Sequence, residues 1–184
     1  MLHVEVLIKE YLNPVHKLWY SAWVYWWPAW RGLYSGKQIR SKWTKYNLIH
    51  EGQYMLDFGC GTGDFTIPAA KIVGKQGRIF ALDCNMRQLE LVEKKAEKAG
   101  LKNVKTILSE QNTDLPDGSL DVVWICDVLH EIRNKREVIS EASRLLKKDG
   151  ILIIYDGMRG KVMSYIDGLF RLEMREGKLL KLVK

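Results

Sequence analysis

The stretch that decides the fold is YMLDFGCGTGD, residues 54–64. An apolar run ends at Phe58, and glycine follows at positions 59, 61 and 63, which is typical of a strand that turns sharply into a helix. Glycine lets such a turn bend tightly and approach a ligand closely. The spacing is D-x-G-x-G-x-G. It departs from the dinucleotide fingerprint G-x-G-x-x-G because Asp64 stands where that pattern needs glycine. The acid at Asp57 favours a ligand with a cation near the loop.

A second acid follows at the right distance from this loop. Residues 77–83 form an apolar run that ends in Asp83, twenty residues after Gly63. A carboxylate at that place can accept hydrogen bonds from both hydroxyls of a ribose. The alternative is a purely structural turn with an incidental acid, which this context disfavours.

Outward from the loop, strands and amphipathic helices alternate. Apolar strands separated by amphipathic helices predict a parallel sheet covered on both faces, hence a doubly wound α/β fold with right-handed crossovers. The chain of 184 residues supports one such core. The predicted strands are 54–58, 77–83, 104–108, 120–126 and 151–155, and the predicted helices are 63–73, 86–99 and 134–147.

These segments together resemble the class I S-adenosylmethionine-dependent methyltransferases. MLDFGCGTGDFT and FALDCNMRQLE are similar to that family's first two motifs, and LSEQNTDLPDGSLDVVWICDVLHEI and RLLKKDGILIIYD to its later ones. The resemblance covers residues 52–156 and is closest to a broad subgroup that includes quinone-biosynthesis and arsenite methyltransferases. It implies a mostly parallel Rossmann-like sheet, S-adenosylmethionine as cofactor, S-adenosylhomocysteine as product and a small-molecule acceptor.

The resemblance also implies roles for individual residues in binding the cofactor. Asp57 and the loop Gly59–Gly63, with Cys60 and Gly61, would hold the methionine part, and Asp83 the ribose. Cys84 would flank the adenine, Glu110 would meet the adenine amino group, and the backbone N–H of Gln111 would face the ring. The following loop is one residue shorter than usual, so the assignment among residues 109–111 is open by one position. Cys126 and Asp127 would lie near the methyl group.

Methyl transfer needs a general base only if the acceptor arrives protonated. Two candidates follow the fourth strand, Asp127 and His130, and histidine has the suitable unperturbed pKa. A plain hydrogen-bonding role for His130 is the alternative. Asp156 ends the fifth strand and either faces the substrate or caps a turn.

The three cysteines, Cys60, Cys84 and Cys126, all fall at carboxyl ends of predicted strands. They line the cofactor pocket as small apolar groups or, in the sharper alternative, bind a soft substrate such as arsenite through thiolates. An odd number of cysteines without CxxC favours a reducing compartment. No cluster has metal-ligand spacing, so no metal site is predicted.

Residues 1–50 differ from the rest of the chain. They hold six of the seven tryptophans, and seven basic side chains against two acidic ones. We expect a helical lid or substrate wall there, with Trp23, Trp26, Trp30 and Tyr34 toward the substrate. The alternatives are peripheral contact with an anionic membrane, whose interface tryptophan and lysine favour, and a partner interface. The uncharged run 18–30 is too short to span a bilayer.

Residues 51–184 form the predicted cofactor domain, which is nearly neutral, so nucleic acid is not an expected partner. Only 28 residues follow Asp156, so the family's sixth and seventh strands are expected to be shortened rather than complete. One helix near 163–170 and one strand near 178–183 are predicted there. An open sheet edge would favour a homodimer. A non-catalytic cofactor-binding or membrane-associated module is the rival function. No secretory signal is expected, and the predicted location is cytoplasmic, with peripheral membrane contact as the variant.

Overall fold

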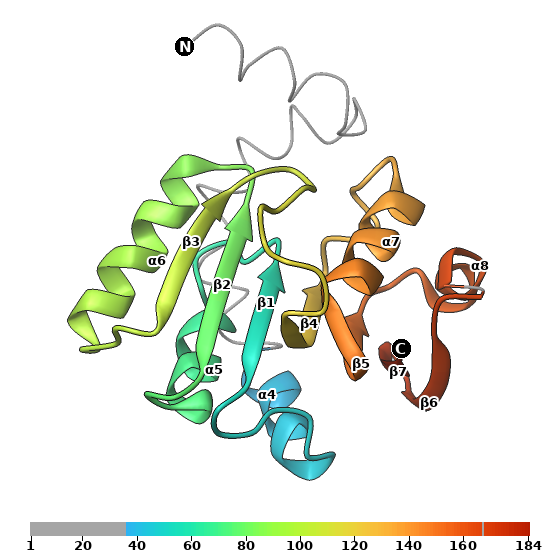
Figure 1. The fold of residues 1–184 in the computed structure, drawn as a ribbon, viewed down its shortest axis with the longest axis horizontal. Coiled ribbons are helices and arrows are strands. Elements are labelled where there is room, and N and C mark those ends of the chain that lie inside the picture. Colours follow the sequence, from blue (N-terminus) through green and yellow to red (C-terminus); the bar gives the residue numbers. More distant parts are fainter. Residues whose placement is uncertain (1–35, 167) are drawn as a thin grey trace, which may run out of the picture. The chain divides into compact units, whose positions relative to one another are not determined.

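The structure of the protein is a computed structural model that describes residues 36–166 and 168–184. Its centre is a seven-stranded sheet with the order β3-β2-β1-β4-β5-β7-β6 (Figure 1). The first five strands are parallel to one another, and β7 runs antiparallel to both β5 and β6. The strands are β1 Tyr54–Phe58, β2 Arg78–Asp83, β3 Val104–Leu108, β4 Leu120–Cys126, β5 Leu146–Tyr155, β6 Arg171–Glu176 and β7 Leu179–Val183.

Helices lie before, between and after the parallel strands. In chain order they are α4 Gly36–Lys45, α5 Thr66–Val73, α6 Met86–Lys98, α7 Lys135–Leu145, the short 3₁₀ turn Arg159–Val162 and α8 Met163–Ile166. The sheet grows from β1 toward β3 on one side and from β4 toward β5 on the other. Right-handed crossovers therefore put α5 and α6 on one face and α7 on the opposite face. This arrangement confirms the predicted doubly wound, mostly parallel α/β fold.

The core lies where the apolar runs predicted it. In β1, four of five residues are buried, and the middle of β4 is fully enclosed, with Trp124 and Ile125 at 0% exposure. On α6, Leu89 and Val92 face the sheet and pack with Ala81 and Cys60. Strands enclosed on both faces have no polar side, which explains why these runs are continuously apolar instead of alternating.

The C-terminal end corrects the sequence prediction. Both final strands are present, as the hairpin of β6 and β7 joined at Gly177, whose φ is 58°. The predicted helix over 163–170 is only the four-residue α8. The prediction erred because β6 is a largely exposed edge strand, RLEMRE, which carries too few apolar residues to give a strand signal. The fifth strand also begins earlier than predicted, at Leu146.

The described chain divides into two units. The larger contains residues 49–130 and 135–184 and holds the whole sheet, while residues 36–48 and 131–134 belong to the smaller. Within the smaller unit, Ile39 and Trp43 lie four residues apart on α4 and are both buried. In the part of the chain that the structure describes, no helix has the length and apolar character needed to cross a bilayer.

Candidate cofactor and active site

The glycine loop between β1 and α5 lies where the direction of strand order reverses, between β1 and β4. Ligands of open α/β sheets bind in the crevice at this point, outside the carboxyl ends of the strands. Gly59, Gly61 and Gly63 have φ values of 71°, 51° and 82°, in the region that favours glycine. The N–H groups of Gly59 and Cys60 donate to the carbonyl of Leu82 at 2.8 and 2.9 Å, so the loop is held against the end of β2.

Asp83 holds two chain segments through its two carboxylate oxygens. Oδ2 accepts the Gly61 N–H at 2.9 Å, and Oδ1 accepts the Asn85 N–H, also at 2.9 Å. The residue is only 4% exposed. Each carboxylate oxygen has two lone pairs, so a carboxylate that accepts N–H groups can also accept a ligand's hydroxyl groups. This geometry suits the ribose role implied by the family resemblance.

Asp57 lies beneath the same loop and is almost completely buried. Thr66 donates its hydroxyl hydrogen to Asp57 Oδ2 at 2.6 Å. Burial, reinforced by the nearby charges of Asp83 and Asp64, raises the pKa of Asp57 to about 7, although the Thr66 hydrogen bond acts in the opposite direction. A buried acid of this kind gains from a neighbouring cation, because the cation favours the ionised form.

The residues around the loop match S-adenosylmethionine in their chemistry. A Cβ built on Gly61 meets no atom within 4 Å, so the loop is open on that side. Two acids, Asp57 and Asp83, flank it, and they match the cationic and ribose parts of that cofactor in chemistry. The donor set therefore fits the group that the sequence predicts.

The segment after β3 is placed by hydrogen bonds at both ends. The Ser109 N–H donates to the Asp83 carbonyl at 3.1 Å, so the turn that carries Glu110 and Gln111 begins beside the end of β2. The Gln111 N–H donates to Ser109 Oγ at 3.2 Å, and the Gln111 side chain donates to Glu137 of α7 at 2.7 Å. The N–H predicted to face the adenine thus already has an acceptor in its own turn.

The three cysteines lie at carboxyl ends of strands, as expected, and form no disulfide. Cys60 is buried, whereas Cys84 and Cys126 are partly exposed. Burial raises the pKa of the Cys60 thiol, and the charges of Asp57 and Asp83 raise it further. Cys60 is therefore a neutral thiol, which suits an apolar wall better than a thiolate ligand.

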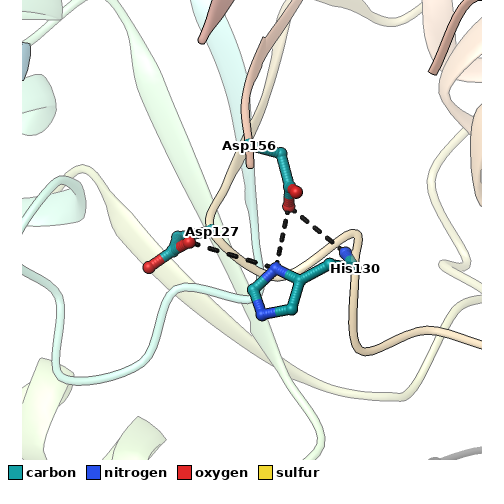
Figure 2. A group of neighbouring side chains, drawn as sticks. All are labelled: Asp127, His130 and Asp156. Atoms are coloured by element: carbon teal, nitrogen blue, oxygen red, sulfur yellow. Dashed lines mark hydrogen bonds and ion pairs between the residues drawn. The ribbon is translucent and has the colours of Figure 1, made fainter. Parts of the chain in front are cut away.

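A polar group gathers at the ends of β4 and β5, on the same edge of the sheet. His130 Nδ1 lies 3.1 Å from Asp156 Oδ2 and 3.9 Å from Asp127 Oδ1 (Figure 2). A tight contact joins this region to the cofactor loop, because a Cβ on Gly59 would lie 2.8 Å from Val128 Cγ2. The two predicted base candidates and Asp156 are therefore together, next to the loop predicted to bind the cofactor.

Sequence reasoning missed three residues that shape this site. Thr66 orients Asp57, Val128 packs on Gly59, and Asn85 caps α6 by accepting the Arg87 N–H at 3.0 Å. The asparagine just before a helix was a recognisable capping signal. Nothing in the sequence marked Thr66 or Val128. Trp23, Trp26, Trp30 and Tyr34, predicted for the lid, lie outside the described residues.

Comparison with known proteins agrees with this geometry. Residues 49–177 match the family described as methyltransferase domain, and the chain belongs to that family. The match includes the glycine loop, Asp83 and the ends of β4 and β5. Among relatives, the demethylmenaquinone methyltransferase of Lactobacillus johnsonii is 36% identical over 113 residues, which are 60% of this chain and 46% of that protein.

Two further comparisons extend this result. The demethylmenaquinone methyltransferase of Geobacillus stearothermophilus is 35% identical over 106 residues, 57% of this chain and 45% of that protein. The crystal structure of a SAM-dependent methyltransferase from Aquifex aeolicus superposes with a TM-score of 0.69 at 25% identity, and the alignment covers 85% of this chain and 91% of that one. The predicted class and its cofactor, S-adenosylmethionine, are confirmed. The chain spans about half the length of the curated relatives it matches.

Proposed function

We propose that this chain transfers a methyl group from S-adenosylmethionine to a small aromatic acceptor of the reduced quinone type. The glycine loop, with Asp57 beneath it and Asp83 beside it, is the observation that carries the cofactor half of the proposal. The acceptor half is supported by the relatives, which are named demethylmenaquinone methyltransferases. A quinol ring is electron-rich and can supply the electron pair for the new bond.

S-adenosylmethionine, when bound, supplies a methyl carbon that is already activated by the sulfonium. The chain's own residues then have to position this carbon and exclude water. Asp57 would hold the cationic methionine part, and Asp83 would accept the ribose hydroxyls. Cys60, Cys84 and Cys126 would line the pocket as small apolar groups, while Glu110 and Gln111 would border the adenine.

The chemistry of the cysteines favours this organic acceptor over a soft metalloid such as arsenite. Thiolate ligands would be needed for arsenite, and the raised pKa of Cys60 keeps that thiol protonated. Among the described residues, the group that has ligand atoms close enough to hold a metal contains no cysteine. An organic acceptor is thus the better supported alternative.

Residues 1–50 are proposed to serve the acceptor, as a lid over it or as a contact with the membrane in which a greasy quinone dissolves. The composition of this segment supports both uses, because tryptophan and basic residues dominate it. Homodimer formation and a cytoplasmic location stay predictions from the sequence.

The experiment combines binding with transfer. Calorimetry should show that the full chain binds S-adenosylhomocysteine, and methyl-labelled S-adenosylmethionine should label demethylmenaquinone that has been reduced with dithionite. The oxidised quinone is the matched control and should stay unlabelled. Failure to bind S-adenosylhomocysteine would overturn the cofactor half. Binding without transfer to the quinol, together with transfer to another acceptor in a panel, would overturn the acceptor half.

Co-sedimentation with liposomes tests the membrane contact separately. The full chain should sediment with vesicles that contain an anionic lipid and remain in the supernatant with neutral ones. Replacing Trp23 by alanine should weaken the sedimentation. A chain that stays in the supernatant with both kinds of vesicle would leave the lid as the use of residues 1–50.

A further inference from the structure

One oxygen of the Asp156 carboxylate contacts His130 at two atoms. Asp156 Oδ2 accepts the backbone N–H of His130 at 3.2 Å and lies 3.1 Å from ring Nδ1 (Figure 2). The other oxygen, Oδ1, accepts the Met158 N–H at 3.0 Å. The Asp156 side chain is 1% exposed, whereas the His130 side chain is 37% exposed. A buried, fixed anion thus holds an imidazole that reaches solvent.

This network assigns the ring tautomer. His130 Nδ1 faces Asp156 at 3.1 Å and Asp127 at 3.9 Å, and both of these groups are acceptors when ionised. A ring nitrogen between two carboxylates carries the proton, so the lone pair of the neutral imidazole lies on Nε2. Figure 2 shows this second nitrogen pointing away from both carboxylates. The basic atom is thus the one turned away from the two carboxylates.

The histidine lies close to the expected site of methyl transfer. Val128, two residues before His130, packs on Gly59 of the cofactor loop. The Asp127 N–H donates to the Tyr155 carbonyl at 2.8 Å, which ties the loop after β4 to the end of β5. The turn begins at Asp127 with φ of 54°, an unusual value for a residue other than glycine. The backbone therefore holds His130 at the edge of the sheet where the cofactor is expected.

We propose that His130 is the general base of the methyl transfer, acting through Nε2, and that Asp156 is its positioning residue. This inference rests on the proposed function and specifies its acceptor as one that arrives with a hydroxyl proton, a hydroquinone or a phenol. Nε2 takes that proton as the O–H bond breaks. The electron pair so released makes the ring a better nucleophile, a ring carbon bonds to the methyl carbon, and the C–S electrons stay on sulfur. The ring carbon then loses its own proton to water, and the imidazolium returns its proton to the oxygen, which restores the hydroxyl and the neutral imidazole.

The charged groups around the pair favour an ionised Asp156. Burial alone would raise the pKa of Asp156, but the hydrogen bonds and charge of His130, together with the Met158 N–H, hold it below the ordinary value. An ionised Asp156 stabilises the imidazolium as it forms. Burial lowers the pKa of Lys135, a lowering that the charge of Asp156 opposes. Burial, Cys126 and Asp127 raise the pKa of Tyr155.

The same three side chains have one ligand atom each within 4.8 Å of one another, a spacing that would also admit a metal ion. The hydrogen bonds favour a proton over a metal ion on His130 Nδ1. A metal on Nδ1 would have to displace the hydrogen that Asp156 accepts, and Asp156 already accepts three hydrogen bonds. Metal binding is therefore an outcome for the test to detect.

The first test reads the tautomer directly, without an acceptor. Long-range ¹⁵N–¹H correlation spectra of the full chain contain the signals of four histidines. The signal that is missing from the spectrum of His130→Gln belongs to His130. We expect Nδ1 protonated and Nε2 unprotonated at high pH, with a mixture of tautomers in Asp156→Asn. An Nε2-protonated ring in the wild type would overturn the proposal. Large shifts of this signal with MgCl₂ or ZnCl₂ would also overturn it, in favour of a metal site.

The second test reads the chemistry with reduced demethylmenaquinone. His130→Gln should lower kcat by roughly 10²–10⁴-fold, while affinity for S-adenosylhomocysteine stays within about twofold of the wild type. Asp156→Asn should lower kcat less and move the acid limb of its pH profile to lower pH, and Asp156→Glu should recover part of the rate. Glu90→Gln, at an exposed position of α6, is the control and should keep the profile. Full kcat in His130→Gln would overturn the base role alone, whereas loss of S-adenosylhomocysteine binding by the wild type would overturn the proposed function.

Discussion

Thr66 donates its hydroxyl hydrogen to Asp57 across 2.6 Å, and neither side chain reaches solvent. The pair joins the end of β1 to the first turn of α5 beneath the glycine loop. Burial keeps the pKa of Asp57 near 7 in spite of this hydrogen bond, so the acid changes charge close to neutral pH. Binding of a cationic ligand above it is therefore coupled to a proton.

The affinity for S-adenosylhomocysteine should depend on pH through Asp57. A cation near the carboxylate favours its ionised form, so ligand binding expels the proton that Asp57 carries below pH 7. We expect binding to be about tenfold weaker at pH 6 than at pH 8. Calorimetry in two buffers that differ in ionisation enthalpy should show release of a proton at pH 6. Asp57→Asn should bind weakly at both pH values, and a wild type with equal affinity at both would contradict the coupling.

The same acid should make the unliganded protein less stable as the pH rises. The folded-state pKa of Asp57 lies above the unfolded value, so the folded state binds more protons between about pH 4 and 7. Its contribution to stability is present at low pH and is lost as the pH rises through about 7. From pH 5 to pH 8, we expect the free energy of unfolding of Asp57→Asn to rise by about 3 kcal/mol relative to that of the wild type. Urea unfolding at both pH values measures this, and a constant difference would contradict it.

Asp83 should matter far more for the cofactor than for the fold. Asp83→Asn keeps one acceptor oxygen but loses the charge and the second acceptor, one of which would serve a ribose hydroxyl. We expect affinity for S-adenosylhomocysteine to fall roughly 10–100-fold, as for loss of a hydrogen bond to a charged group. Asp64→Asn removes an exposed acid of the same loop, which pairs with Lys95 at 3.3 Å. At pH 8, where Asp57 is ionised with or without this neighbour, it should leave affinity nearly unchanged. Equal losses in both variants would argue against a ribose role.

Much of this site was visible in the sequence because it depends on local rules. The apolar runs predicted β1 to β4 within a residue or two, and glycine at alternate positions predicted the loop. Asp83 was recognised because the end of a strand has a fixed place in a parallel sheet. Residues 109–111 could not be assigned singly, since the turn there depends on hydrogen bonds such as that from Gln111 to Ser109 Oγ.

Other features needed strand register across long separations. His130 and Asp156 are 26 residues apart, and they meet because Cys126 pairs with Tyr155 at the ends of β4 and β5. Both residues were candidates in the sequence, but their pairing was not predictable from it. Strand β6 was missed for a different reason, whereas the strand predicted near 178–183 is β7. The edge strand RLEMRE carries only two apolar residues, and only the turn at Gly177 marked it.

Gly59 offers the sharpest test of how the cofactor loop is packed. Alanine there would take φ of 71° and place its Cβ 2.8 Å from Val128 Cγ2. We expect Gly59→Ala to lower the free energy of unfolding by about 2–4 kcal/mol, in part from the backbone and in part from the clash. Gly61→Ala is the matched control: its φ is also positive, at 51°, but its Cβ meets nothing within 4 Å. It should lose only about 1–2 kcal/mol, the backbone cost.

The two parts of the Gly59 effect separate in a double-mutant cycle. Val128→Ala removes the methyl groups that the new Cβ would meet, so the pair Gly59→Ala/Val128→Ala should be more stable than the sum of the single changes implies, by about 1 kcal/mol or more. Urea unfolding of the four proteins gives this coupling energy. Strict additivity would mean that the loop after β4 does not pack on the cofactor loop as described.

The variant Gly61→Ala should also bind S-adenosylhomocysteine more weakly than the wild type, because its Cβ would enter the open space proposed for the cofactor.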